Sequence, residues 1–132
     1  MAIEIHESLR LVQITLSGVT TEEDLGYFFK GIKKYLQEAT APIALVIDLT
    51  ENDGGTAQQR GDLRDFFSGK GGRFGMCAGI AAVTKTEGQG GFLRGLLALG
   101  PMPCPYRIFE SRGEAVSWAR SNIKAATPPA VE

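Results

Sequence analysis

Two glycine-rich stretches are the places in this chain where residue type and spacing favour ligand binding. One runs from Asp53 to Thr56 and follows the apolar segment 43–49, and the other runs from Glu87 to Gly91 and follows the apolar segment 78–83. Open α/β sheets bind ligands beyond the carboxyl ends of parallel strands, and a glycine-rich turn into a helix offers backbone N–H groups to an anion. We therefore predict a partner or regulatory loop made of Thr50, Asp53, Gly54, Gly55 and Thr56, and an anion or ligand site made of Gly88, Gly90 and Gly91.

Both stretches also have a simpler structural interpretation. Asp, Gly and Thr are the residues that tight turns and helix N-caps select, so the first stretch also fits a turn followed by an N-cap. The second stretch departs from the dinucleotide-binding pattern because Leu93 stands where that pattern has its third glycine. Gly69-Lys70 lacks the following Ser or Thr of a phosphate-binding loop. Nucleotide binding is therefore disfavoured, and we predict no cofactor.

Groups suited to nucleophilic catalysis or metal binding are few. The only histidine, His6, falls in the first predicted strand, where a cross-strand surface role is expected. Cys77 and Cys104 have no activating partner visible in the sequence, so we expect reduced thiols that fill space. No pair of Cys or His residues has the spacing of a zinc finger. The sequence thus predicts no catalytic residue, no metal site and no enzyme activity, and an enzyme built on the glycine-rich turns ranks last among the hypotheses.

The segment 92–99 carries more large apolar side chains than one buried helix face requires. A helix is predicted there, and two interpretations of its apolar surplus stay open. It is either a well-covered core helix or an exposed patch that binds a protein partner or an apolar ligand. The apolar residues are Phe92, Leu93, Leu96, Leu97 and Leu99, of which Phe92, Leu96 and Leu97 form the predicted contact face.

The elements that must position these sites begin with a hairpin and a long helix. Segments 3–7 and 11–16 alternate apolar and polar residues, which predicts an antiparallel pair of half-buried strands. Thr20 and Glu23 have the spacing of a capping box and predict the start of the longest helix. One continuous apolar stripe follows at helical spacing, made of Leu25, Phe28, Phe29, Ile32 and Leu36.

The remaining elements alternate between strands and helices. Segment 43–49 is almost unbroken apolar, as a strand covered on both faces should be, and a polar loop follows over 50–55. Thr56 caps a predicted shorter helix with Leu63, Phe66 and Phe67 inward, and segment 78–83 predicts another strand. After the helix at 92–99, three prolines forbid regular structure until a final strand at 106–109.

The closing segment 105–120, PYRIFESRGEAVSWAR, predicts that last strand and an amphipathic helix. Ser111 and Glu114 form a second capping-box pattern at the start of this helix. The complete order is ββαβαβαβα, which predicts an α/β fold with a mixed sheet of about five strands packed by about four helices. We expect one domain over residues 1–123 and a disordered tail over 124–132.

Composition excludes several classes of protein. Of the 132 residues, 43% are hydrophobic and the net charge is −1, which fits an ordinary soluble domain and lacks the basic surface of a general nucleic-acid binder. No apolar run is long enough to span a membrane, and no signal peptide is visible. With two cysteines the chain is no disulfide scaffold. We expect a cytoplasmic protein that does not bind nucleic acid.

The element order and several motifs resemble those of the SpoIIAA-like, or STAS-like, family. The resemblance is carried by VIDL in the central strand, by the helix start GVTTEEDLGYFFKGIKKYL, and by the ending. The resemblance implies a mixed sheet packed by helices. The better-known members of this family are anti-sigma-factor antagonists and STAS modules of signalling proteins and transporters. Within the closing segment 105–120, the residues most similar to the family are Phe109, Glu110, Glu114, Ala115 and Trp118.

One departure from the family bears on function. Regulatory members have an Asp-Ser-Ser-Gly type motif after the central strand, and a partner kinase phosphorylates its serine. Here no serine occurs between Leu49 and Phe67, and Thr50 and Thr56 differ in their spacing from the strand. We therefore do not carry the phosphorylation switch over to this chain.

Two hypotheses of function follow. The first is a non-catalytic regulatory module that presents the loop 50–56 to a protein partner, with homodimer formation left open. The second is a carrier or sensor of an apolar small molecule or lipid that uses a pocket beside segment 92–99. An exposed face at Leu96 and Leu97 without a cavity favours the first, and a closed apolar cavity favours the second.

Overall fold

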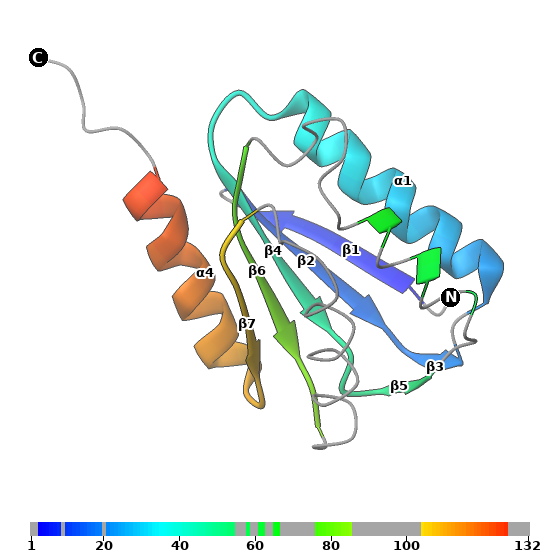
Figure 1. The fold of residues 1–132 in the computed structure, drawn as a ribbon. Coiled ribbons are helices and arrows are strands. Elements are labelled where there is room, and N and C mark those ends of the chain that lie inside the picture. Colours follow the sequence, from blue (N-terminus) through cyan, green and yellow to red (C-terminus); the bar gives the residue numbers. More distant parts are fainter. Residues whose placement is uncertain are drawn as a thin grey trace, which may run out of the picture.

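The fold is built on a five-stranded mixed sheet with the strand order β1-β2-β4-β6-β7 (Figure 1). The computed structural model describes residues 3–8, 10–19, 21–54, 58, 61–62, 65–66, 76–85 and 104–126. The antiparallel pair β1–β2 lies at one edge, and every other neighbouring pair in the sheet is parallel. The strands are β1 (Ile3–Ser8), β2 (Leu11–Leu16), β4 (Ile43–Asp48), β6 (Cys77–Val83) and β7 (Tyr106–Phe109).

The predicted hairpin and the buried central strands are confirmed. β1 and β2 pair over their full length, from Ile3 opposite Leu16 to Ser8 opposite Leu11. All six residues of β4 and all seven of β6 are buried, as expected for strands with a helix on each face. The unbroken apolar runs of the sequence therefore mark the centre of the sheet, and the alternating runs mark its exposed edge.

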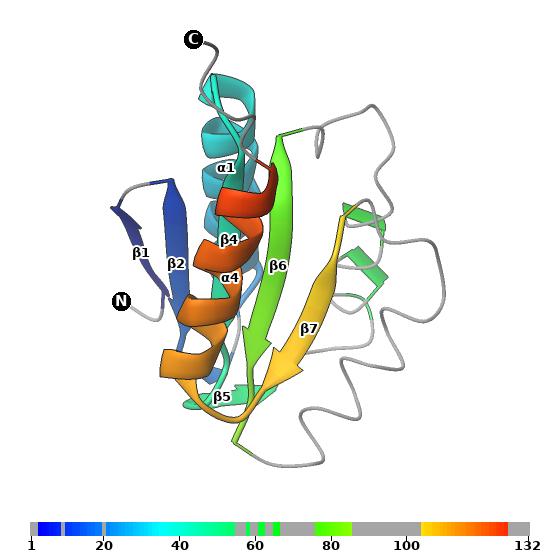
Figure 2. The same cartoon turned by 90° about the vertical axis from the view of Figure 1, so that its left-hand side faces the viewer.

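Two helices cover opposite faces of the sheet, α1 (Glu22–Glu38) on one side and α4 (Arg112–Ala126) on the other (Figure 2). Ile43, Leu45 and Ile47 of β4 face the α1 side, where they pack with the apolar stripe of that helix. Ala44 and Val46 alternate with them and face α4. Each large side chain removed from water in this way contributes about 1.5–3 kcal/mol.

The start of α1 differs by one residue from the prediction. Thr21 is the N-cap: its hydroxyl accepts from the Asp24 N–H at 3.1 Å, and the Asp24 carboxylate accepts from the Thr21 N–H at 3.2 Å. The predicted Thr20–Glu23 capping box is therefore wrong. The sequence Thr-Thr-Glu-Glu-Asp offers two overlapping pairs with the right spacing, and the backbone geometry of the first turn decides between them, with Leu25 N donating to Thr21 O.

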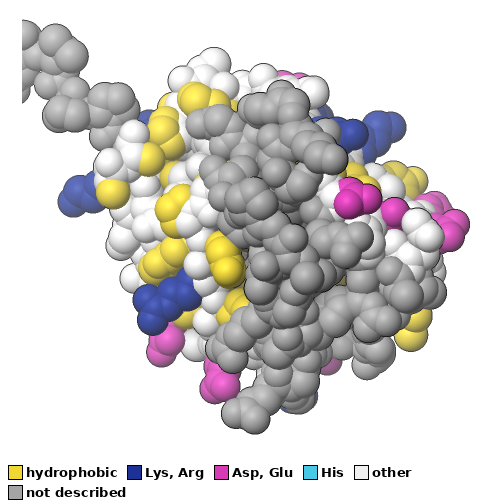
Figure 3. Space-filling view, in the orientation of Figure 1, with side chains coloured by type: hydrophobic (Ala, Val, Ile, Leu, Met, Phe, Trp, Pro, Cys, Tyr) yellow, Lys and Arg dark blue, Asp and Glu magenta, His cyan; other side chains and the backbone are white. Residues whose placement is uncertain are grey.

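The stripe on α1 packs as predicted. Leu25, Phe28, Ile32 and Leu36 are buried, and Phe29 is half-buried and stacks on the Phe66 ring at 4.5 Å between centroids. On the outer surface, acidic side chains lie over the end where α1 begins and basic ones lie further along it (Figure 3). The acidic first turn suits the positive end of the helix dipole, whereas no basic residue lies in the last turn.

The closing helix α4 lies close to the sheet because the facing residues are small. Ala115 and Ala119 are fully buried against Ala44, Ala78 and Ala81, which belong to β4 and β6. At Gly79 a β-carbon would lie 2.7 Å from Asn122 Nδ2 and 3.2 Å from the Trp118 ring. The glycine at this position lets the helix approach β6.

α4 begins at the expected N-cap and extends further toward the C-terminus than the sequence predicts. Ser111 Oγ accepts from the Glu114 N–H at 3.4 Å, as the sequence predicts for an N-cap. Trp118 is half-buried and packs against the Phe109 ring, with centroids 5.7 Å apart. The helix continues to Ala126, so it includes residues 124–126 that the sequence assigns to the tail.

The segment expected as a polar loop over 50–55 contains a short strand. β5 (Asn52–Gly54) pairs in parallel with β3 (Gly18–Val19), and Gly18 N donates to Glu51 O at 2.9 Å. Gly18 has φ +70°, a conformation that glycine adopts without steric cost. The loop prediction is wrong for residues 52–54 because two or three residues carry no alternation for a sequence pattern to detect.

The described part of the chain contains two complete helices. Residues 58, 61–62 and 65–66 also have helical backbone, in the segment where a helix capped by Thr56 was predicted. The helix predicted at 92–99 lies outside the described residues. Among the helices that are described, none has the length and apolar character needed to cross a membrane.

Candidate functional site

A polar cluster occupies the carboxyl ends of β2 and β4. Thr15 and Asp48 are direct partners in the parallel register, and Gln13 stands two residues before Thr15 on the same face of β2. This face is the one that α4 covers, because Leu11 of β2 and Val46 of β4 point to the same side as these polar residues and belong to the α4-side core. Toward the carboxyl ends of the strands, the side chains on this face change from apolar (Leu11, Val46) to polar (Thr15, Asp48).

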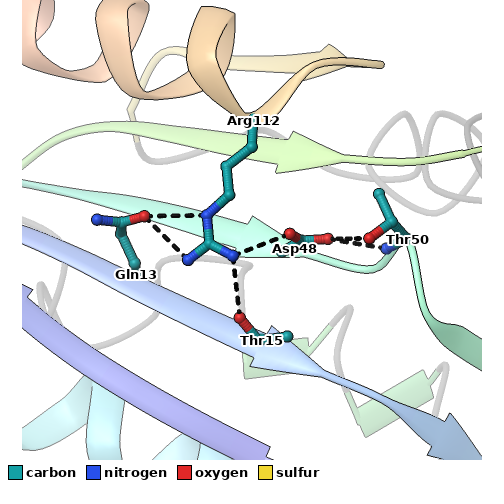
Figure 4. A network of polar contacts seen from close by, with 5 residues as sticks. All are labelled: Gln13, Thr15, Asp48, Thr50 and Arg112. Atoms are coloured by element: carbon teal, nitrogen blue, oxygen red, sulfur yellow. Dashed lines mark hydrogen bonds and ion pairs between the residues drawn. The ribbon is translucent and has the colours of Figure 1, made fainter.

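Arg112, the first residue of α4, lies over this cluster and contacts three of its side chains (Figure 4). Its Nη1 pairs with Asp48 Oδ2 at 3.1 Å and donates to Thr15 Oγ1 at 3.4 Å. Its Nε and Nη2 both donate to Gln13 Oε1, at 3.1 and 3.0 Å. The guanidinium thus fastens the start of α4 to two neighbouring strands.

The Asp48 carboxylate is the centre of the cluster. Its side chain is 10% exposed, against 41% for Arg112. While Oδ2 faces Arg112, Oδ1 accepts from the Thr50 N–H at 2.9 Å and from the Thr50 hydroxyl at 2.6 Å (Figure 4). A buried carboxylate needs a charge partner and hydrogen-bond donors, and this one has both. The cluster therefore fixes the position at which the chain leaves β4.

The exposed side chains of β1 extend this cluster into a continuous polar face. His6 pairs with Gln13, and Glu4 pairs with Thr15, so both side chains stand on the same side of the sheet as Arg112. Both are exposed. We call Glu4, His6, Gln13, Thr15 and Arg112 the polar face. It lies on the side of the sheet that α4 covers over β4 and β6 and leaves open over β1 and β2.

The contacts of Asp48 with Arg112 and Thr50 are suited to fixing the conformation of the polar face. The Arg112 and Asp48 charges neutralise each other, and the Asp48 oxygens are occupied by donors from Arg112 and Thr50. Among the residues that the structure describes, no three His, Cys, Asp or Glu side chains are grouped so that they can hold a metal ion.

Among the described residues of the predicted regulatory loop, Thr50 is the one that contacts this polar cluster. Thr50 is half-buried and bonded to Asp48, and Asp53 and Gly54 lie in β5, whose backbone pairs with β3. The other predicted site residues lie outside the described residues: Gly55 and Thr56 of the loop, Gly88, Gly90 and Gly91 of the anion site, and Phe92, Leu96 and Leu97 of the apolar face.

Sequence reasoning missed the centre of the cluster. Asp48 and Arg112 are 64 positions apart, and Gln13 and Arg112 are 99 apart, so no local motif joins them. Two signals pointed to them. Asp48 is a charged residue at the end of an apolar strand, and Arg112 is a cation in the first turn of a helix, where the dipole disfavours it. Both residues therefore require a partner of opposite charge.

The family model described as SpoIIAA-like matches residues 11–120, which include every element from β2 to most of α4. The chain belongs to the SpoIIAA-like family. The resemblance drawn from the motifs is thereby confirmed. No curated protein matches the chain in sequence.

Solved structures with the SpoIIAA-like architecture are similar to the chain over nearly its whole length. One is a protein of Shewanella loihica with a SpoIIAA-like fold, with a TM-score of 0.64, 24% identity, and coverage of 89% of this chain and 92% of that one. An anti-sigma factor antagonist of Mycobacterium paratuberculosis has a TM-score of 0.58, 17% identity and the same coverage, 89% and 92%. The anti-sigma factor antagonist SpoIIAA in its unphosphorylated form has a TM-score of 0.60, 13% identity, and coverage of 90% and 98%. At these identities the similarity shows a shared fold.

Proposed function

We propose that this SpoIIAA-like protein is a non-catalytic regulatory module that binds a protein partner through the polar face and the segment 50–56 that follows β4. The observation that carries the proposal is the Asp48 carboxylate, which ties Arg112 and Thr50 together at the carboxyl end of the central strand β4. Such a contact holds an exposed guanidinium and the start of the loop in one fixed arrangement. Binding surfaces gain affinity when their groups are ordered before the partner arrives.

Three further facts support this assignment. The solved structures with the same fold include two anti-sigma factor antagonists, which act against another protein, an anti-sigma factor. The polar face combines a carboxylate, an imidazole, an amide, a hydroxyl and a guanidinium, a mixture that suits a polar protein surface. A net charge of −1 argues against nucleic acid as the partner.

The proposal does not extend the phosphorylation switch of regulatory members to Thr50. The Thr50 hydroxyl donates to Asp48 at 2.6 Å, so its proton and its orientation are already engaged. A phosphate at this oxygen would bring two negative groups together and break the contact that orders the loop. We infer that the surface acts without a covalent change at Thr50.

The proposal includes several finer features. We expect the protein to act in the cytoplasm, and we expect helices near 56–67 and 92–99 that bring the total to about four. Self-association through the same surface is a further outcome that the binding experiment measures. The alternative function, a carrier of an apolar ligand beside Phe92, Leu96 and Leu97, rests on the sequence pattern alone.

The test is native mass spectrometry of tagged protein purified gently from its own cells. We expect the wild-type protein to retain a partner of defined mass, and Arg112→Ala and Glu4→Lys to lose most of it. Arg120→Ala is the matched control, because Arg120 is an exposed arginine on the same helix outside the polar face. Thermal unfolding must show that each variant stays folded. Equal retention by Arg112→Ala, Glu4→Lys and Arg120→Ala would contradict the assignment of the surface, and a retained lipid would favour the carrier.

A further inference from the structure

The two cysteines, expected from the sequence to fill space without an activating partner, lie directly against each other. Cys77 is the first residue of β6, and Cys104 lies two residues before β7, the strand that pairs with β6. Their sulfur atoms are 3.3 Å apart, and both cysteines are free thiols. The sequence alone does not show this contact, because the parallel pairing of β6 and β7 brings together residues 27 positions apart.

The geometry favours a bond between these sulfurs. A disulfide has a sulfur–sulfur distance of about 2.0 Å, so the two atoms need to approach by roughly 1.3 Å, a movement within the range of small side-chain rotations. The strand pairing that fixes the two backbones continues next to the pair, where Ile80 N donates to Pro105 O at 2.9 Å. The pair also sits at the margin of the α1-side core, with Cys77 buried and Cys104 half-buried, so that solvent reaches it from the Cys104 side.

The hydrogen bonds assign different roles to the two thiols. Cys104 Sγ donates to Cys77 Sγ, and Cys77 Sγ donates to the Gly79 carbonyl oxygen at 3.5 Å. The donor from Cys104 lowers the pKa of Cys77 against the opposing effect of burial, and the same contact raises the pKa of Cys104. The thiolate is the nucleophilic form of cysteine. Of the two sulfurs, Cys77 therefore has the greater thiolate character.

We propose that Cys77 and Cys104 form a reversible redox site that peroxides oxidise to an intramolecular disulfide. In the first step the Cys77 thiolate attacks one peroxide oxygen, the O–O bond breaks, and Cys77 becomes a sulfenic acid while hydroxide leaves and takes up a proton. In the second step the Cys104 sulfur, on losing its proton, attacks the Cys77 sulfur and displaces hydroxide. The sum is two thiols and one hydrogen peroxide giving one disulfide and two waters.

The bond would join the beginning of β6 to the segment that leads into β7. It closes a loop of the chain between residues 77 and 104, and such a cross-link restricts the unfolded chain. A cellular dithiol reductant returns the pair to the thiol state by exchange through a mixed disulfide. In a reducing compartment, cysteines that form a transient disulfide are typical of redox-sensing sites.

The test uses the full chain, reduced, freed of reductant and treated with one equivalent of hydrogen peroxide. We expect the intact monomer to lose about 2 Da, the mass of two hydrogens, and to regain it with dithiothreitol. The oxidised protein should unfold at least about 5 °C higher than the reduced protein. A covalent dimer, or sulfinic and sulfonic acids formed without the monomeric disulfide, would overturn the proposal.

Two variants, each retaining one thiol, separate the proposed roles. Cys104→Ser should stop at a sulfenic acid of Cys77 that dimedone traps, because the resolving thiol is gone. Cys77→Ser should react with peroxide at least about 10-fold more slowly than Cys104→Ser, because the lone Cys104 lacks the donor that favours a thiolate. Equal rates in the two variants would contradict the assignment of roles. Circular dichroism checks that both variants are folded, and if Cys77→Ser fails this check, Cys77→Ala replaces it.

Discussion

A single buried carboxylate organises the candidate site of this protein. Asp48 receives one charged contact from Arg112 and two hydrogen bonds from Thr50, which come from different segments of the chain. Removing it leaves these donors without their acceptor, which costs more than the contacts themselves contribute. The residue therefore links the stability of the fold to the shape of the proposed binding surface.

The coupling between Asp48 and Arg112 can be measured with a double-mutant cycle. Asp48→Asn should lower the free energy of unfolding by about 1–3 kcal/mol, because a buried charge partner is lost. The pairwise coupling with Arg112→Gln should be about 1 kcal/mol, since the arginine is 41% exposed and water screens the pair. Urea denaturation of the four proteins gives the value. The matched cycle with exposed Arg120→Gln should give a coupling close to zero, and equal couplings in both cycles would argue against the contact.

At the scale of the element, the start of α1 shows how two overlapping sequence patterns are resolved. Thr21 and Asp24 exchange side-chain contacts with each other's backbone N–H groups. Thr21→Ala should therefore lower the free energy of unfolding by about 1 kcal/mol. Thr20→Ala is the comparison, measured by thermal or urea unfolding under the same conditions. A loss confined to Thr20→Ala would restore the capping box expected from the sequence.

The approach of α4 to β6 depends on the absence of a side chain at Gly79. Gly79→Ala should destabilise the protein by about 1–3 kcal/mol, because its methyl group meets Trp118 and Asn122. Gly26→Ala is a control with the opposite sign: Gly26 lies inside α1, is exposed and has open space around its added carbon. It should stabilise the protein by about 0.5–1 kcal/mol. Two losses of the same size would show that Gly79 has no special packing role.

The sequence predicts the larger elements of this fold because each carries its own repeating pattern. β4 is buried on both faces, so its sequence is an unbroken apolar run. α1 is buried on one face, so its apolar residues recur at helical spacing. Ser111 is the N-cap that marks the start of α4. β3 and β5 leave no such pattern, because their pairing depends on where the ends of β2 and β4 meet.

The contacts at the two candidate sites are hidden from the sequence for a related reason. Asp48 meets Arg112, and Cys77 meets Cys104, through strand order and helix placement, which are properties of the whole sheet. From the residue types alone, Asp48 is recognised only as a charged residue at a strand end, and Cys77 and Cys104 only as two thiols. Their pairing requires knowing that β6 stands between β4 and β7, and that α4 returns over β4 and β6.

At the scale of the whole molecule, the sheet divides the interior into two cores of different character. The α1 side is filled with large side chains, including Phe28, Ile32 and Leu45, and the α4 side is built mainly from alanine. Both cores rest on β4 and β6, which are buried along their whole length. Unfolding either side removes cover from the same two strands, so the two halves should lose structure together.

Hydrogen exchange followed by mass spectrometry tests this cooperativity. Amides of β4 and β6 should exchange slowest, at the rate of global unfolding, while β1 and β7 at the sheet edges should exchange earlier. Phe28→Ala, which opens a cavity on the α1 side and costs about 3–5 kcal/mol, should speed the exchange of β4, β6 and α4 alike. Tyr27→Ala is the control, because this neighbouring aromatic is 48% exposed and its loss should leave the pattern unchanged. If Phe28→Ala released α1 and left α4 protected on the sheet, the two cores would be independent units, and a partner on the polar face would stabilise only the α4 side.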